Sequence, residues 1–267
     1  MAEWTIELAA LTDVGTERAH NEDACAVLHD GPGRGVAVVA DGVSLGNGGE
    51  VASQMAVEVL LRAYQEEPAT LAAGQRLYRA VQQANIEIYD RSVAVPELRG
   101  MSTTLTAVVA DQGALTAVHV GDSRLYLVRG GAITQLTRDH TVAAEKVRLK
   151  LLSAEKARTH PDRSVLTRSV GRELIVSRDR LTRMLGGGDV LLVCSDGLHG
   201  VLPDGELARV ASTQPPAAAC RALVDTANAL GTPDNLSVAI LRVGGGVPPP
   251  AEDGSLAGRV RRLLRLG

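Results

Sequence analysis

Aromatic residues are nearly absent from this chain of 267 residues: they make up 2% of it, and there is no Phe. Hydrophobic residues still account for 45% of the sequence, so a core must be built from Val, Leu, Ile and Ala. Modules that bind single-stranded nucleic acid stack the bases on exposed aromatic side chains. The formal net charge of -3 adds no attraction to a phosphate backbone. We therefore expect no nucleic-acid partner.

Long apolar runs are missing as well. No segment approaches the roughly 20 residues that a helix needs to cross a bilayer, and residues 1–4 carry neither the basic nor the apolar region of a secretory signal. Cysteine is scarce, with only Cys25, Cys194 and Cys220. An odd number without paired spacing fits reduced thiols better than disulfides or a zinc site. These absences predict a cytoplasmic protein with no transmembrane segment.

The strands and helices that are present favour an α+β fold. Val51, Met55 and Val59 recur at helical spacing, as do the apolar residues at 77–88, and Pro215-Pro216 opens a later helix. The strands cluster and the helices come in pairs, which favours a layered sandwich of antiparallel sheets covered by helices. Runs rich in β-branched residues predict strands at 5–11, 35–40, 103–110, 114–119, 124–128, 190–194 and 236–243.

The composition changes once along the chain. We interpret residues 1–243 as one domain, within which residues 141–188 are charged and helix-prone and are expected to lie over the surface as an insertion. Residues 244–267 begin with Gly and Pro and are predicted to be a flexible linker and a short basic tail. Two interpretations stay open for the Arg- and Leu-rich residues 256–266: a solvated tail, or an amphipathic helix that docks on a membrane surface or a partner.

Four aspartates stand where predicted strands begin or end: Asp41, Asp122, Asp196 and Asp234. Each one alone is typical of a turn or a helix N-cap. A layered fold can bring such strand ends together, and buried carboxylates of like charge cost roughly several kcal/mol unless a proton or a cation neutralises them. Oxygen-rich sites of this kind suit Mg²⁺ or Mn²⁺.

Seven short motifs then resemble, in the same order, those of the metal-dependent protein phosphatases (the PPM, or type 2C, family), in particular their bacterial branch. They cover nearly the whole domain: residues 12–23 (TDVGTERAHNED), 39–42 (VADG) with 49–53 (GEVAS), 102–105 (STTL), 121–124 (GDSR), 136–140 (LTRDH), 194–198 (CSDGL) and 233–238 (PDNLSV). The resemblance implies a four-layer α-β-β-α sandwich of two mainly antiparallel sheets covered by helix pairs. We interpret residues 139–141 as a helix start, with Thr141 as its cap.

The resemblance also implies a metal site. Asp41 would bridge two Mn²⁺ or Mg²⁺ ions, with the Gly42 carbonyl as a further ligand, and Asp196 and Asp234 would complete the ligands of one ion. Asp122, together with Asp196, would support a third and weaker ion. The second ion would be held, partly through water, by two neighbouring acids: Glu22 and Asp23.

The reaction that the resemblance implies is hydrolysis of phosphoserine and phosphothreonine in proteins by a water that the ions activate. Arg18 would grip the substrate phosphate, a role suited to its planar guanidinium; Arg18, Asp41, Asp196 and Asp234 are the expected catalytic residues. Asn235 is expected to orient Asp234. The enzyme would be a monomer that opposes a Ser/Thr kinase in signalling.

One position departs from the family pattern. Bacterial members commonly carry a His five residues after the bridging aspartate, and here that residue is Gly46, so the proton donor for the leaving group is not identified. The alternative interpretation is a catalytically weak domain that keeps the fold and binds phosphoproteins.

Overall fold

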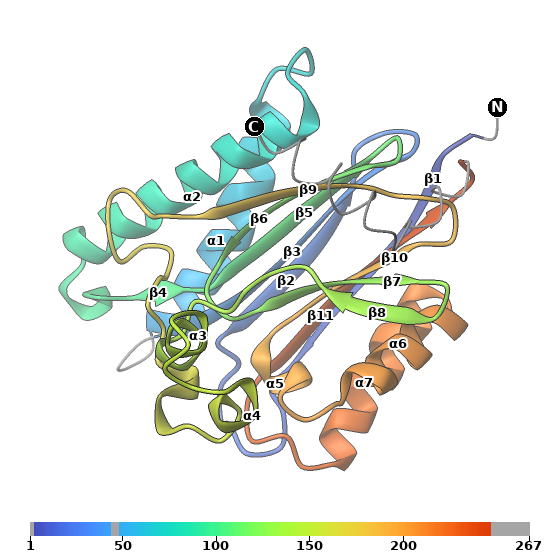
Figure 1. Ribbon diagram of the computed structural model, residues 1–267. Coiled ribbons are helices and arrows are strands. Elements are labelled where there is room, and N and C mark those ends of the chain that lie inside the picture. Colours follow the sequence, from blue (N-terminus) through green and yellow to red (C-terminus); the bar gives the residue numbers. More distant parts are fainter. Residues whose placement is uncertain (1–2, 44–47, 247–267) are drawn as a thin grey trace.

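Two stacked β-sheets form the centre of the computed structural model, which describes residues 3–43 and 48–246 (Figure 1). Every strand pairing in them is antiparallel. The first sheet has the order β1-β11-β10-β7-β8: Thr5–Asp13, Leu236–Gly244, Val190–Cys194, Arg124–Arg129 and Ala132–Gln135. The second has the order β2-β3-β5-β6-β9, with β4 paired to β3: Asp23–His29, Arg34–Val43, Leu105–Asp111, Ala114–Val120, Asp179–Met184 and, for β4, Ser102–Thr103.

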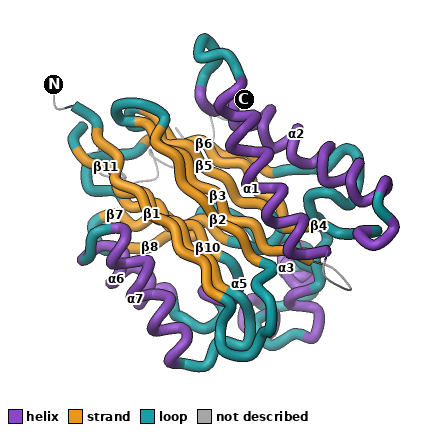
Figure 2. Tube along the Cα trace, turned by 180° about the vertical axis from the view of Figure 1, so that it is seen from behind, coloured by secondary structure: helices purple, strands orange, loops and turns teal. Residues whose placement is uncertain are grey.

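Helices cover the outer face of each sheet (Figure 2). The long helices α1 (Gly48–Glu66) and α2 (Ala73–Ala94) pack on the second sheet. The first sheet is covered by α5, α6 and α7: Asp196–His199, Asp204–Thr213 and Pro216–Ala229. Four short helical segments lie in the connections: η1 (Pro96–Leu98), α3 (Val142–Arg148), α4 (Ala154–Ala157) and η2 (Pro161–Ser164). No helix of the described residues is both long and apolar enough to cross a membrane.

The apolar run of β3 shows how the layers are held together. Val36, Val38 and Ala40 point toward α1 and α2, whereas Ala37 and Val39 point toward the other sheet, because successive side chains of a strand alternate between its faces. All five are fully buried. A third apolar layer joins the first sheet to α6 and α7. The layers therefore follow the predicted α-β-β-α order, with cores dominated by Val, Leu, Ile and Ala.

Three strands were not predicted from the sequence: β2, β8 and β9. The last of these corrects the expectation for residues 141–188. β9 pairs with β6 along its length, and Val170, Val176 and Leu185 are buried, so the second half of this segment belongs to the sandwich. β9 escaped prediction because it is an exposed edge strand with the sequence DRLTRM and therefore shows little apolar periodicity.

A buried side-chain amide holds the backbone of residues 171–174, in the middle of the segment 141–188. The side chain of Asn85 on α2 is fully buried; it accepts a 2.9 Å hydrogen bond from the Gly171 N–H and donates 2.9 Å bonds to the carbonyls of Glu173 and Leu174. Predictions that concern Gly46 and residues 247–267 fall outside the described residues.

Candidate metal centre

Of the predicted site residues, all but Asp23 line one opening, with a volume of about 220 Å³, at the end of the sandwich where β3, β10 and β11 meet. Its wall includes Arg18, Glu22, Asp41, Gly42, Asp122, Asp196, Asp234 and Asn235, and, from parts of the sequence not predicted to contribute, Val43, Thr104, Ser164 and Leu166. Five acids that are up to 212 positions apart in the chain (Glu22 to Asp234) thus come together.

Strand register places the acids. Asp23 and Asp41 are directly opposite each other on β2 and β3. Asp196 follows β10 and Asp234 precedes β11, and these two strands are paired with Cys194 opposite Val238. Because these neighbouring strands are antiparallel and paired in this register, the carboxylates of four aspartates lie at the same end of the sandwich: Asp23, Asp41, Asp196 and Asp234.

Thr104 fixes the backbone of Asp41. The Thr104 N–H donates to the Asp41 carbonyl at 2.8 Å, and the Asp41 N–H donates to the Thr104 hydroxyl at 3.0 Å. The same hydroxyl lies 2.8 Å from Oγ of Ser123, the residue after Asp122. This buried threonine thus holds Asp41 directly and contacts the residue next to Asp122. It lies between β4 and β5, where the pairing with β3 is interrupted.

Asp23 lies under the opening and is almost completely buried. Ser195 donates a 2.6 Å hydrogen bond to its Oδ2, and the Ser237 N–H donates to the Ser195 hydroxyl at 2.9 Å. Burial raises the pKa of Asp23 to about 7, the Ser195 hydrogen bond opposes this rise, and the charge of Asp196 adds to it.

Burial and neighbouring carboxylates also raise the pKa values of three further aspartates. Burial raises the pKa of Asp41 well above its usual range, and the charges of Asp23 and Asp196 raise it further. The pKa of Asp122 is also raised well above its usual range by burial and by Asp196. Burial and Asp234 raise the pKa of Asp196. Without a cation, these side chains cannot all be ionised at neutral pH.

The donor set fits divalent cations. Oδ1 of Asp196 is buried and makes no hydrogen bond, which is costly for a carboxylate oxygen unless a cation accompanies it. The acids do not form a closed cage by themselves, because nowhere in residues 3–43 and 48–246 are three His, Cys, Asp or Glu side chains grouped as one ion site. A hard cation that keeps several waters and takes a backbone carbonyl needs no such cage.

Gly42 is required by close packing beside this opening. A Cβ on Gly42 would lie 2.1 Å from the Gly49 carbonyl oxygen and 2.6 Å from that of Glu22, and the Gly42 N–H donates to the same Glu22 oxygen at 3.0 Å. The Glu22 carboxylate in turn lies against Gly49, where a Cβ would be 2.6 Å from Oε1. Any side chain at position 42 would push the Glu22 and α1 segments apart.

Arg18 reaches the opening from the loop before β2. Its Nη2 lies 2.9 Å from Oδ2 of Asp234, with the two side chains 48% and 36% exposed. Asn235 holds this loop: its side-chain amide donates to the carbonyls of Val14 and His20 at 2.7 and 2.9 Å, and its Oδ1 accepts from the Glu22 N–H at 2.8 Å. Sequence analysis expected Asn235 to orient Asp234; its N–H does contact Asp234 Oδ1 at 2.8 Å, but its side chain positions the Arg18 loop.

The motif at 136–140 is structural. Asp139 accepts three hydrogen bonds from Arg124, at 2.7, 3.0 and 3.2 Å. His140 and Gly121 are bonded twice: the His140 N–H donates to the Gly121 carbonyl at 2.7 Å, and the Gly121 N–H donates to His140 Nδ1 at 3.1 Å. The next helix begins after Thr141, whose hydroxyl accepts from the Ala144 N–H, as predicted.

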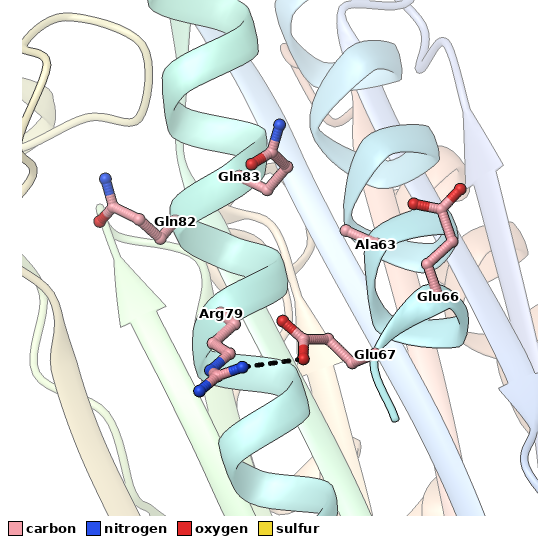
Figure 3. A pocket seen from close by; sticks show the side chains of 6 residues that line it. All are labelled: Ala63, Glu66, Glu67, Arg79, Gln82 and Gln83. Atoms are coloured by element: carbon pink, nitrogen blue, oxygen red, sulfur yellow. Dashed lines mark hydrogen bonds and ion pairs between the residues drawn. The ribbon is translucent and has the colours of Figure 1, made fainter. Parts of the chain in front are cut away.

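A larger hollow lies elsewhere, between α1 and α2 (Figure 3). Its wall contains one ion pair, between Arg79 and Glu67 at 3.1 Å; the remaining side chains are Ala63, Glu66, Gln82 and Gln83. Within the described residues, its one cation is already paired and no cluster of carboxylates faces it, so we assign it no chemistry.

Sequence analysis missed Thr104, Ser195, Ser164 and Leu166 as contributors to the site. The first two lie inside recognised motifs, so the motifs did carry a signal for them. Ser164 and Leu166 come from the variable segment, where nothing in the sequence marks them.

Comparisons with known proteins point to one family. A family model described as protein phosphatase 2C matches residues 15–237. The chain is 35% identical over 234 residues to the serine/threonine phosphatase stp of Listeria monocytogenes, covering 86% of this chain and 93% of that protein. It is 36% identical over 247 residues to the serine/threonine protein phosphatase PstP of Mycobacterium tuberculosis, covering 91% of this chain and 46% of that one.

Solved structures show the same fold. The Mycobacterium tuberculosis phosphatase PstP/Ppp superimposes with a TM-score of 0.80 at 31% identity, covering 93% of this chain and 100% of that one. The catalytic domain of PstP in complex with two manganese ions gives a TM-score of 0.79 at 32% identity, with 90% and 99% coverage. The chain is therefore a member of the protein phosphatase 2C family, of the bacterial serine/threonine phosphatase kind.

Proposed function

We propose that this chain removes phosphate from phosphoserine and phosphothreonine in proteins, as a metal-dependent hydrolase that uses two Mn²⁺ or Mg²⁺ ions and a weaker third. The observation that carries the proposal is the group of aspartates that line one opening, with a buried and unpartnered oxygen on Asp196. Its relatives are named serine/threonine phosphatases, and a neighbour's catalytic domain holds two manganese ions. The alternative of a phosphoprotein-binding domain is not favoured, because every expected metal-binding acid is present.

The residues that would hold the ions divide into three groups. Asp41, Asp196 and Asp234 would take one ion, and Asp41, Glu22 and Asp23 the other, with the Gly42 carbonyl as a further ligand. Asp122 with Asp196 would take the weaker third. Bound ions neutralise the acids and supply an activated water and charge for the phosphate oxygens.

Side chains of the protein itself would bind the phosphate and hold the metal-binding acids in position. Arg18 is the one cation in the described wall of the opening, and its fork of donors suits the dianionic phosphate. Asn235 keeps the Arg18 loop beside Asp234. Thr104 and Ser195 hold Asp41 and Asp23 in place, so the site is rigid before substrate arrives. Gly46 occupies the position at which bacterial members of the family commonly carry a His, and it lies outside the described residues.

The test is hydrolysis of a phosphothreonine peptide with Mn²⁺, with Mg²⁺ and with a chelator. We expect activity only with metal, and a loss of about 10²-fold or more in Asp41→Asn and Asp234→Asn. Asp225→Asn is the matched control, because Asp225 is exposed on α7, away from the opening. Full activity under chelation, or in Asp41→Asn, would contradict the proposal.

We also propose that the phosphatase acts as a cytoplasmic monomer on the products of a Ser/Thr kinase, and that residues 244–267 are a linker and tail separate from the domain of residues 1–243. The monomer is checked by light scattering. The division is checked by truncation after Gly246, which should leave the rate on phosphopeptide unchanged.

A further inference from the structure

Residues 141–166 form a lobe outside the two sheets, which we call the basic lobe. It contains α3, α4 and η2, which stand together near α5 and β4 (Figure 1). Its two ends are closed by a bridge between Thr141 and Leu166 and by a 2.9 Å bond from the Val142 N–H to the Val165 carbonyl. Inside, Lys146 pairs with Asp162 at 2.7 Å. The lobe is therefore a fixed surface, not a loose loop.

The basic lobe borders the metal centre. Ser164 and Leu166, at its closing end, line the same opening as Asp41 and Asp196. A polypeptide that presents a phosphorylated residue to this opening must run along its rim, and the lobe makes up part of that rim.

The lobe carries an excess of unpaired positive charge. It has six Lys and Arg against three Asp and Glu, a net charge of +3 in a chain whose total is -3. Two cations are neutralised within it, Lys146 by Asp162 and Arg148 by Glu145. The other four are exposed, and within the described residues their side chains form no ion pair or hydrogen bond: Lys150, Lys156, Arg158 and Arg163.

Large apolar side chains lie among these cations. Leu149, Leu151 and Val165 are 56%, 74% and 50% exposed. A solvated charged surface has no need of them, whereas apolar side chains rimmed by charge are typical of a surface that binds another protein.

We infer that the basic lobe docks the substrate segment beside the phosphorylated residue, and that this segment carries acidic side chains and a large apolar one. The inference rests on the proposed phosphatase function and adds a substrate class to it. The lobe's four free cations attract such a segment from solution.

The experiment compares three phosphothreonine peptides that share one leucine but have acidic, glutamine-containing or basic flanks. We expect kcat/KM with Mn²⁺ to be about tenfold higher for the acidic than for the glutamine peptide at low salt, and the difference to shrink at high salt, as screening requires. The triple variant Lys156→Gln, Arg158→Gln, Arg163→Gln should remove this preference and leave the glutamine peptide and a small aryl phosphate unaffected.

Two further variants separate charge from contact. Leu151→Ser should lower kcat/KM for the acidic and glutamine peptides alike, at both salt concentrations, because an apolar contact is not screened. Arg221 is an exposed cation on α7 whose side chain forms no ion pair or hydrogen bond within the described residues, and Arg221→Gln should change nothing. Equal rates on the acidic and glutamine peptides in the wild type, or an equal loss on peptide and aryl phosphate in the triple variant, would overturn the inference.

Fluorescence anisotropy keeps this inference distinct from the catalytic proposal. If no peptide is hydrolysed, tighter binding of the acidic peptide that the triple variant abolishes would still support the lobe as its docking surface. Binding that is the same for all three peptides would overturn it.

Discussion

Nη2 of Arg18 lies 2.9 Å from Oδ2 of Asp234, so the expected phosphate-binding cation contacts an expected metal ligand. The guanidinium therefore has two possible anionic partners, the carboxylate and the substrate phosphate. A cation at Asp234 would release Arg18 for the phosphate by competing for the same oxygen.

Removing the Arg18 charge should consequently have opposite effects on the two ligands. We expect Arg18→Met to raise KM for a phosphopeptide by about tenfold or more, since a charge-assisted bidentate contact is lost, and to lower the Mn²⁺ concentration needed for half-maximal activity. For Arg18→Lys we expect both quantities to lie between those of the wild type and those of Arg18→Met. Titration of activity with Mn²⁺ at several substrate concentrations measures both; a variant that weakens metal and substrate together would show that Arg18 holds the site in shape instead.

Proton and metal binding should compete at Asp23. Burial first, and then the charge of Asp196, raise the pKa of this folded carboxyl to about 7, above the roughly 3.9 of an unfolded chain. The folded metal-free chain thus binds more protons than the unfolded one between these values, so this carboxyl's contribution to stability is present at low pH and is lost as the pH rises toward and through about 7.

We therefore expect the Tm of chelator-treated protein to fall between about pH 4 and pH 7 and to level off above that, and saturating Mn²⁺ to abolish the fall because cations replace the protons. Thermal unfolding followed by circular dichroism measures this. Asp23→Asn is the diagnostic variant, as it should flatten the metal-free curve. An unchanged slope in that variant would assign the effect to other groups.

Close packing at Gly42 makes a separate prediction. Alanine there would place its Cβ 2.1 Å from the Gly49 carbonyl oxygen, and both neighbours in the way are backbone, which cannot rotate aside. Gly42→Ala should lower the free energy of unfolding by about 2 kcal/mol or more and reduce activity strongly. Gly205→Ala on α6, where nothing lies within 4 Å of an added Cβ, is the control and should change stability by less than about 1 kcal/mol. Urea unfolding compares the two.

The sequence predicted the buried strands and the acids at their ends, and the physical reason is visible at β3. Its residues 36–40 are buried on both faces, so the strand must be continuously apolar and is recognisable without any partner. Asp41 could then be singled out as the acid where that run ends. The convergence of four such acids followed from the family motifs and not from periodicity.

The edge strand β9 and the contribution of Ser164 to the opening could not be predicted from local sequence patterns. β9 is an exposed strand whose sequence, DRLTRM, has no regular alternation of polar and apolar residues. Its place is fixed by pairing with β6 and by the contacts of Asn85. Ser164 joins the opening because the basic lobe closes back on itself through Thr141 and Leu166. These contacts join residues that are far apart in sequence, and no local pattern encodes them.

A buried histidine predicts a second pH dependence, of opposite sign to that of Asp23. His119 is 1% exposed; its ring nitrogens lie 2.9 Å from the Thr106 hydroxyl and 2.9 Å from the Arg138 carbonyl. Burial, and then the nearby His140, lower its pKa to about 4. An unfolded histidine titrates near roughly 6.5. The unfolded chain therefore binds the extra proton first, and the stability contributed by neutral His119 is lost as pH falls from about 6.5 toward 4.

The shift corresponds to about 3 kcal/mol at most for this one group, and comparison with a variant isolates it from the aspartates. We expect His119→Gln to be less stable than the wild type at pH 7.5, where its packing and hydrogen bonds are impaired, but to approach the wild type at pH 5, because glutamine has no proton to gain. His29→Gln, at an exposed position on β2, should follow the wild type at both values. Urea unfolding at the two pH values gives the four free-energy differences. Curves for His119→Gln and wild type that run parallel between pH 7.5 and 5 would show that the pKa of His119 is the same in the folded and unfolded chains, and would contradict the prediction.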